Sequence, residues 1–400
     1  MPNQADGGKM GHTGTSSWQA PCPLMPKANH GNKAILSVGH DDEKSPMDQY
    51  LAIIARQPWL ARVNFSQGTP MVLPVYDTPW LKQQLRSLRH QAVRDLAWCC
   101  LGQPLLQTLP DSPHTQLLSG LAPVSRLQTW LQVLDADPTP LLNHLALFKS
   151  TRLGVYYEAL WHFYFTQQGD WELLGYNQQV NYRGQTLGAF DFLCRRQNTY
   201  WHIESAIKFY LGNSSGGDLS EWQHWIGPNN SDRLDIKLNH LQQHQLRLSA
   251  NDEKNPARHW LQQHFTEAPF WHSGLLLQGY FFYPYQEAHT GQAAGAHPDH
   301  QGGYWMRWQD CEGFLSQSPA KRWVVIERTH WVSPAQGDEL DSLMTSGQLA
   351  IWLSDWTQAS HKPIMIAEVE LFTHQAPLPV WQEQERYFVV PDNWPATHNT

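Results

Sequence analysis

The stretch 188–211, GAFDFLCRRQNTYWHIESAIKFYL, constrains the fold more than any other part of the chain. It contains two apolar, β-prone runs, residues 189–194 and 199–211, which are joined by the polar residues 195–198. Aromatic and β-branched residues on either side of a short polar break predict a β-hairpin. Charged side chains are rarely buried in such a hairpin without a partner or a chemical task.

Three charged residues nevertheless lie inside these runs: Asp191, Glu204 and Lys208. Side chains alternate along a strand, so His202, Glu204 and Lys208 are expected on one face, with Asp191 beside Glu204 on the neighbouring strand. Two carboxylates in an apolar setting repel each other and stay protonated unless a cation neutralises them.

Carboxylate oxygens are suitable ligands for Mg²⁺ or Mn²⁺, and Mg²⁺ usually takes one or two protein carboxylates together with water and phosphate oxygens. The pattern therefore predicts a metal held by Asp191 and Glu204. Lys208 would then orient or deprotonate the attacking water, or contact the phosphate. The alternative is structural: a salt bridge between Glu204 and Lys208 at the end of a sheet, with Asp191 capping a turn.

A fourth candidate, Glu158, lies in the segment 151–167, TRLGVYYEALWHFYFTQ, as its only acidic residue. Apolar and aromatic residues cover nearly every face of this predicted helix, so we expect it to be largely buried. A carboxylate there is costly unless it reaches a cation, a hydrogen-bond donor or a solvated cleft. A bond to a tyrosine hydroxyl or an arginine is the alternative to a functional role.

The segment 232–248 predicts a helix with a leucine stripe and a second, basic stripe. The basic stripe consists of Arg233, Lys237, His240, His244 and Arg247. Residues three and four apart share a helix face. A basic face near a carboxylate site would suit a nucleic-acid backbone. An ordinary solvated face, with Asp235 and Asp252 as counter-charges, explains the same pattern.

Composition limits the remaining choices. The chain has 400 residues, 41% of them apolar and 16% charged, with a formal net charge of −8. This charge excludes a global basic field for nucleic acid, so any such binding needs a local patch. The five cysteines are odd in number and show no C-x-x-C spacing, which argues against a disulfide framework or a structural zinc site. With neither a signal peptide nor a run of 18 apolar residues, we expect a cytoplasmic protein that does not enter a membrane.

We expect five regions along the chain. For residues 1–75 we expect a largely disordered extension with a short helix at 46–56, and for residues 76–150 we expect a helical segment. Residues 151–285 hold the core, 286–303 an exposed loop, and 304–400 a C-terminal α+β extension. Before the core we expect helices at 79–100, 125–134 and 140–148. Within the core we expect further strands at 171–180 and 273–284. After the core we expect strands at 322–327, 363–371 and 387–390, and a helix at 337–356.

The order helix, three strands, helix, strand in the core resembles the αβββαβ core of the PD-(D/E)XK nuclease superfamily, within a mixed α/β (α+β) fold. This resemblance implies that the Asp and Glu on the strands, here Asp191 and Glu204, hold Mg²⁺. It also implies that a Lys serves the attacking water and that a Glu on the first helix, here Glu158, assists. One position departs from the pattern: the residue two after Glu204 is Ala206, and Lys208 follows four after.

On a straight strand that places Lys208 roughly 13 Å along instead of about 6.6 Å. A bulge would shorten this distance. Without one, Lys208 does something else, and the site binds without cleaving.

The chain is also similar to a bacterial family, domain-of-unknown-function family 1853 (DUF1853), from about residue 80 to the C-terminus. The matching segments are VRDLAWCC (93–100), YYEALWHFYF (156–165), TLGAFDFL (186–193), HIESAIKFYLG (202–212) and GPNNSDRLDIKL (227–238). Together these patterns predict a Mg²⁺-dependent nuclease that hydrolyses phosphodiester bonds in DNA or RNA. Two alternatives stay open: a catalytically inactive scaffold that binds nucleic acid or protein, and a buried charge network with a structural role.

Overall fold

The structure is a computed structural model. It describes residues 78–110, 112, 114–268, 270–285, 291–337, 343–373 and 379–395. The chain divides into two units, Met1–Pro70 and Met71–Thr400, and every described residue belongs to the second. The predicted extension 1–75, with its helix at 46–56, lies outside the described residues.

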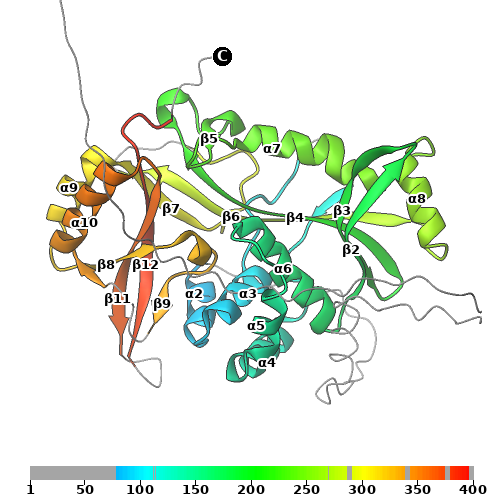
Figure 1. Cartoon of the computed structure of the whole chain (residues 1–400), viewed down its shortest axis with the longest axis horizontal. Helices are drawn as coiled ribbons and strands as arrows, with labels where there is room; N and C mark the ends of the chain where they lie inside the picture. The colour runs from blue at the N-terminus through cyan, green and yellow to red at the C-terminus, as the bar shows by residue number, and fades with distance from the viewer. Residues whose placement is uncertain are drawn as a thin grey trace, which may run out of the picture. The chain divides into compact units, whose positions relative to one another are not determined.

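One mixed sheet of twelve strands runs through the described part of the chain (Figure 1). The order of neighbouring strands is β10 (Met344–Thr345), β8 (Arg322–Ile326), β11 (Ile364–Phe372), β12 (Val380–Val390), β7 (Gly302–Arg307), β6 (Trp271–Pro284), β4 (Thr199–Gly212), β3 (Gln185–Arg196) and β2 (Glu172–Tyr182). Three short strands pair beside this row, β1 (Thr115–Leu117) with β6, β5 (Trp225–Ile226) with β4, and β9 (Gln336–Gly337) with β12. The mixed α/β class expected from the sequence is confirmed.

The strands β2, β3 and β4 form an antiparallel meander, and β4 then runs parallel to β6 from Tyr200 to Leu211. The parallel pair needs a crossover between its strands, and the segment between β4 and β6 contains α7 (Leu234–His240) and α8 (Pro256–His264). Because β6 also pairs in parallel with β7, and β7 with β12, the C-terminal region continues the sheet of the core.

Helices cover both faces of the central strands. The first group packs on one face, where Trp98, Trp161 and Phe209 belong to one buried cluster. Its helices are α2 (Thr78–Arg86), α3 (Gln91–Leu101), α4 (Val124–Ala136), α5 (Thr139–Leu145) and α6 (Leu153–Gln167). In Figure 1, α3 to α6 lie below the central strands and α7 lies above them. Leu238 of α7 packs with Tyr210 on this second face.

Two further clusters cover the ends of the sheet. Leu261 of α8 packs with Leu193 of β3, which closes the end formed by β2 and β3. At the other end, α9 (Trp308–Ser316) and α10 (Ser346–Ala359) cover β8, β11 and β12, and the fully buried Trp323 belongs to that cluster. None of the helices in the described part of the chain is long and apolar enough to cross a membrane.

The N-terminal helix expected at 79–100 is two helices, α2 and α3, so that expectation was wrong in its length. The main-chain N–H groups of Arg89 and His90 donate to the carboxylate of Asp135, at 2.9 to 3.0 Å. Asp135 lies on α4, so a distant carboxylate caps the start of α3 and stabilises the break.

The loop expected to be exposed at 286–303 differs as well. In its described part, from residue 291, Ala293, Ala296 and Gln301 are buried, and β7 begins at Gly302.

Candidate functional site

The candidate site forms where β3 and β4 separate. These strands pair from Arg196↔Thr199 to Phe192↔Ile203, and no pair follows in the register. The turn consists of Gln197 and Asn198, so β3 extends two residues further into the polar break than expected, whereas β4 begins at Thr199 as expected. Beyond Ile203, strand β4 keeps its pairing with β6 but not with β3. The edge of β4 that faces β3 is therefore open at Glu204 and Ser205.

Asp191 fills this opening. The main-chain N–H of Ser205 donates to Oδ2 of Asp191 at 2.9 Å, and the Ser205 hydroxyl lies 3.4 Å from the same oxygen. A side-chain carboxylate thus takes the place that a strand carbonyl occupies in a continuous ladder. The contact positions Asp191 at the point where the sheet splits, next to Glu204.

Glu204 is fully buried, and both of its carboxylate oxygens have a partner. His202 Nε2 lies 2.7 Å from Oε1, and the side-chain amide of Gln245 donates to Oε2 at 2.5 Å. The second nitrogen of His202, Nδ1, lies 2.8 Å from the hydroxyl of Ser249. His202 and Glu204 share the face expected from strand alternation. The buried carboxylate is satisfied by hydrogen bonds, as burial requires.

The charge of Glu204 acts on the two other carboxyl groups of this site. Burial, followed by the nearby charge of Glu204, raises the pKa of Asp191 to about 8. Burial also raises the pKa of Glu158 above its ordinary value, and Glu204 adds to this shift. A hydrogen bond from Tyr176 on β2 opposes the shift at Glu158. Glu158, Asp191 and Glu204 therefore lie within one electrostatic field, although they come from α6, β3 and β4.

The ammonium group at these carboxylates belongs to Lys237 of α7. It donates to Oε1 of Gln245 at 3.1 Å, so one glutamine side chain connects Lys237 with Glu204. Burial, followed by the charge of Lys208, lowers the pKa of Lys237, whereas Glu204 and Asp191 raise it. Lys237 in turn lowers the pKa of both Asp191 and Glu158. Lys237 thus interacts electrostatically with all three carboxylates.

Lys208 lies on the expected face but has a different partner. Its ammonium group forms an ion pair with Asp232, and the hydroxyl of Tyr210 lies 3.4 Å from the other oxygen of the same carboxylate. Asp232 belongs to the segment that leads into α7. The structure does not place Lys208 against Asp191 or Glu204. The salt bridge between Glu204 and Lys208, the structural alternative from the sequence, is not formed.

The basic stripe is not continuous. The helix expected at 232–248 is regular only in α7, then becomes a π-helical turn, η3 (Leu241–Gln245), and a 3₁₀ turn, η4 (Leu246–Ser249). The residue before the first turn of α7 is Arg233, whose side chain pairs with Asp235 at 2.7 and 2.9 Å.

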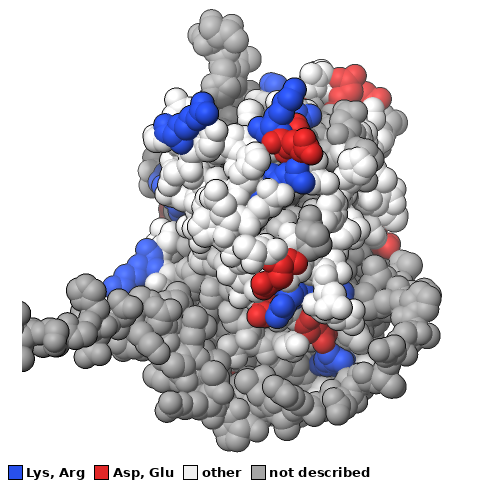
Figure 2. All heavy atoms as spheres, turned by 90° about the vertical axis from the view of Figure 1, so that its right-hand side faces the viewer, with Lys and Arg blue, Asp and Glu red and all other residues white. Residues whose placement is uncertain are grey.

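Arg233 and three other members of the stripe, His240, His244 and Arg247, are exposed, whereas Lys237 is turned into the site. His240 Nδ1 lies 3.1 Å from Oε1 of Gln245, and the ring centroids of His240 and His244 are 5.3 Å apart. Figure 2 views the end of the molecule that lies to the right in Figure 1. On its described surface, cationic and anionic side chains are interspersed and form no field of one sign.

Sequence reasoning missed Gln245 and Asp232, which decide where the two lysines go. Gln245 is the last residue of the π-helical turn, and such turns are frequent at functional sites. Asp232 appeared only as the start of a predicted helix. Both residues stand in polar segments, so neither carried a signal of its own.

The donor set agrees in kind with a magnesium site. One oxygen of Asp191, Oδ1, accepts no hydrogen bond from the described residues, and Glu204 lies beside it. Among the described residues, no group of three or more His, Cys, Asp or Glu side chains converges as metal ligands. A site of two carboxylates with water and phosphate oxygens needs no third. Glu204 would have to give up the amide of Gln245 to bind through Oε2.

The described part of the chain is thus a mixed α/β protein with a carboxylate cluster at the point where two central strands separate. A family model described as Domain of unknown function (DUF1853) matches residues 94–390, and the chain belongs to that family. No curated protein and no solved structure matches the chain.

Proposed function

We propose that this protein is a Mg²⁺-dependent phosphodiesterase of the PD-(D/E)XK type that hydrolyses DNA or RNA. The observation that carries the proposal is the position of Asp191, a buried carboxyl group bonded to Ser205 at the point where β3 and β4 separate, and burial and the charge of Glu204 raise its pKa. Strongly perturbed acids of this kind cluster at functional sites. A divalent cation between Asp191 and Glu204 would remove the repulsion that raises this pKa.

Each side chain has a role in such a reaction. Asp191 and Glu204 would hold the metal, which when bound polarises a phosphate oxygen and lowers the pKa of a bound water. Lys237, an ammonium partly removed from solvent, would stabilise negative charge that develops on the phosphate. Glu158, held by Tyr176, would bind a second ion or orient the water. Lys208 keeps Asp232 in place and so positions the start of α7.

Substrate positioning falls to the exposed basic residues beyond the site. His240, His244 and Arg247 follow Lys237 along the chain and lie on the surface. Arg233 is already paired with Asp235, so it offers less net charge to a phosphate. Because the chain as a whole is acidic, binding through these few residues would be weak and sensitive to salt.

A second function, a catalytically inactive scaffold that binds nucleic acid or protein, is favoured by a specific feature. Both carboxylate oxygens of Glu204 have partners within the chain, His202 and Gln245, and Lys208 is neutralised by Asp232. A cluster closed in this way resembles a buried polar network, which needs no ligand.

Calorimetric titration of Mg²⁺ and Mn²⁺ separates the two functions. Wild type is compared with Asp191→Asn, which keeps the acceptor for Ser205 but removes the charge. Glu267→Gln, an exposed carboxylate remote from the site in sequence, is the matched control. Metal binding that disappears only in Asp191→Asn, with metal-dependent cleavage of labelled DNA or RNA by wild type, supports the phosphodiesterase. Absence of metal binding by wild type refutes it and leaves the scaffold.

A further inference from the structure

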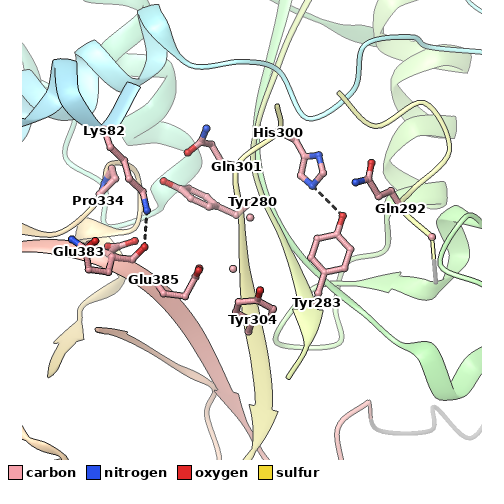
Figure 3. Close-up of a pocket in the computed structure, with 14 residues that line it drawn as sticks. Lys82, Tyr280, Tyr283, Gln292, His300, Gln301, Tyr304, Pro334, Glu383 and Glu385 are labelled. Carbon is pink, nitrogen blue, oxygen red and sulfur yellow. Dashed lines mark hydrogen bonds between the residues drawn. The ribbon is translucent and has the colours of Figure 1, made fainter. Parts of the chain in front are cut away.

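A separate cavity opens where the sheet forks. Strand β7 pairs with β6 only over Phe281–Pro284 and with β12 only from Tyr387 onward. The earlier parts of β6 and β12 therefore have no β7 between them. A cavity of about 470 Å³ lies at this fork and is bordered by α2, β6, β7, β12 and the segment before β7 (Figure 3). It is formed by different residues from the carboxylate site.

The fork depends on a glycine at the start of β7. A Cβ atom at Gly303 would lie 2.6 Å from the carbonyl oxygen of Arg386 and 2.9 Å from the ring of Phe282. Both distances are shorter than any side chain tolerates, so the backbones of β7 and β12 approach closely only because this residue is glycine.

One wall of the cavity is already neutralised. Glu383 pairs with the buried guanidinium of Arg386 at 2.6 and 2.9 Å, and the N–H of Ala335 donates to the same carboxylate at 2.8 Å. Arg386 also lies 4.1 Å above the ring centroid of Tyr280. These contacts satisfy the charges of both residues, so this wall is a rigid surface without a free charge.

Two other charges border the cavity without such a partner. Lys82 of α2 donates to the main-chain oxygen of Gln384 at 2.6 Å, and no carboxylate of the described residues forms an ion pair with it. The carboxylate of Glu385 accepts one long bond of 3.4 Å, from the N–H of Arg386, and forms no ion pair with a cationic side chain of the described residues. Burial raises the pKa of Glu385 and the charge of Lys82 lowers it, so the two groups interact without touching.

The opposite side of the cavity is polar and uncharged. The hydroxyl of Tyr283 lies 3.0 Å from Nε2 of His300, and burial lowers the pKa of that imidazole, which keeps it neutral. Figure 3 shows this pair and Gln292 across the cavity from Lys82 and Glu385. Amide, phenol and imidazole groups recognise a neutral polar side chain by hydrogen bonds.

We propose that the fork cavity binds a free α-amino acid with a polar, uncharged side chain, whose carboxylate pairs with Lys82 and whose ammonium pairs with Glu385. Lys82 has two further N–H groups beyond the one given to Gln384, and Glu385 has unused lone pairs. A zwitterion satisfies both unmatched charges at once, whereas a simple cation or anion would satisfy one and be repelled by the other. This binding site is independent of the phosphodiesterase proposal.

Thermal unfolding and calorimetry of the full chain test the proposal, with L-glutamine as the probe. Two matched probes each lack one charge: N-acetyl-L-glutamine has no ammonium and the α-amide of L-glutamine has no carboxylate. We expect L-glutamine to raise the melting temperature and to bind at least about tenfold more tightly than either matched probe. The reason is that each matched probe can form only one of the two ion pairs. Equal effects of the three probes, or no binding of L-glutamine, would overturn the proposal.

Variants locate the binding in the cavity. Glu385→Gln keeps the size of the side chain and removes its charge, and we expect it to weaken L-glutamine binding about tenfold or more. Glu370→Gln, an exposed glutamate on the neighbouring strand β11, is the matched control and should bind as wild type does. If Glu385→Gln binds L-glutamine with unchanged affinity, the ligand lies elsewhere and the assignment is wrong. Lys82→Met gives the same test from the carboxylate side, provided that its melting temperature without ligand is unchanged.

Discussion

Replacing Asp191 by asparagine should make the stability of the protein less dependent on pH. The pKa of Asp191 is about 8 in the folded protein, against an ordinary value of 3.8. Between these two values the folded protein keeps a proton that the unfolded chain has released. The free energy of unfolding of wild type therefore falls as the pH rises through this window. Asparagine is uncharged throughout and can still accept the Ser205 N–H.

The size of the effect follows from the shift. Each pH unit within the window changes the contribution of one such group to the free energy of unfolding by at most about 1.4 kcal/mol. Glu158, whose pKa is also raised, shares part of the titration. We therefore expect the free energy of unfolding of Asp191→Asn to rise by roughly 1–3 kcal/mol relative to that of wild type between about pH 5 and about pH 7.

Urea unfolding of both proteins at several pH values measures this difference directly. All other titrating groups are common to the two proteins, so the change in their difference with pH reports Asp191 and its immediate neighbours. Added Mg²⁺ should reduce the gain, because a bound cation favours the carboxylate form of wild type. Stability curves that run parallel over the whole range would refute the assignment of Asp191 as a buried, proton-retaining group.

Three further predictions concern neighbouring residues. Lys237→Met should lower the kcat of metal-dependent cleavage of a labelled substrate by about a hundredfold or more, whereas Lys208→Met should lower it at most about tenfold. Equal losses of kcat would contradict the separate roles of the two lysines. Gln245→Ala should tighten Mg²⁺ binding about tenfold in calorimetry, because the substitution frees Oε2 of Glu204 from its hydrogen bond. An unchanged affinity for Mg²⁺ would exclude this oxygen as a ligand. Leu238→Ala should lower the free energy of unfolding by about 2–5 kcal/mol in urea titrations, since this side chain is fully buried between α7 and the sheet. A loss below about 1 kcal/mol would mean that α7 packs only loosely.

Local patterns predicted much of the core. The alternation of apolar residues identified the hairpin and put His202, Glu204 and Lys208 on one face, because the strand period of two is a local property. The strand that became β6 and the helix that became α6 were also found from their apolar runs. These elements were predictable because their burial imposes a periodic composition on neighbouring residues.

Periodicity failed where contacts from distant segments decided the backbone. The break between α2 and α3 depends on Asp135, which comes from another helix. The leucine and basic stripes of 232–248 implied one regular helix, but a π-helical turn shifts the register after His240. A single inserted residue in a helix leaves composition almost unchanged, so no pattern in the sequence could show it.

The sequence by itself determined which ionisable side chains lie among apolar neighbours, since Asp191, Glu204 and Glu158 each interrupt an apolar run. Only the tertiary structure decided how those charges are matched. Lys208 lies on the expected strand face, yet Asp232 holds it, and Lys237 reaches the carboxylates from α7 through Gln245. Burial is encoded by local patterns of polarity, whereas the pairing of charges depends on distances between segments far apart in the chain.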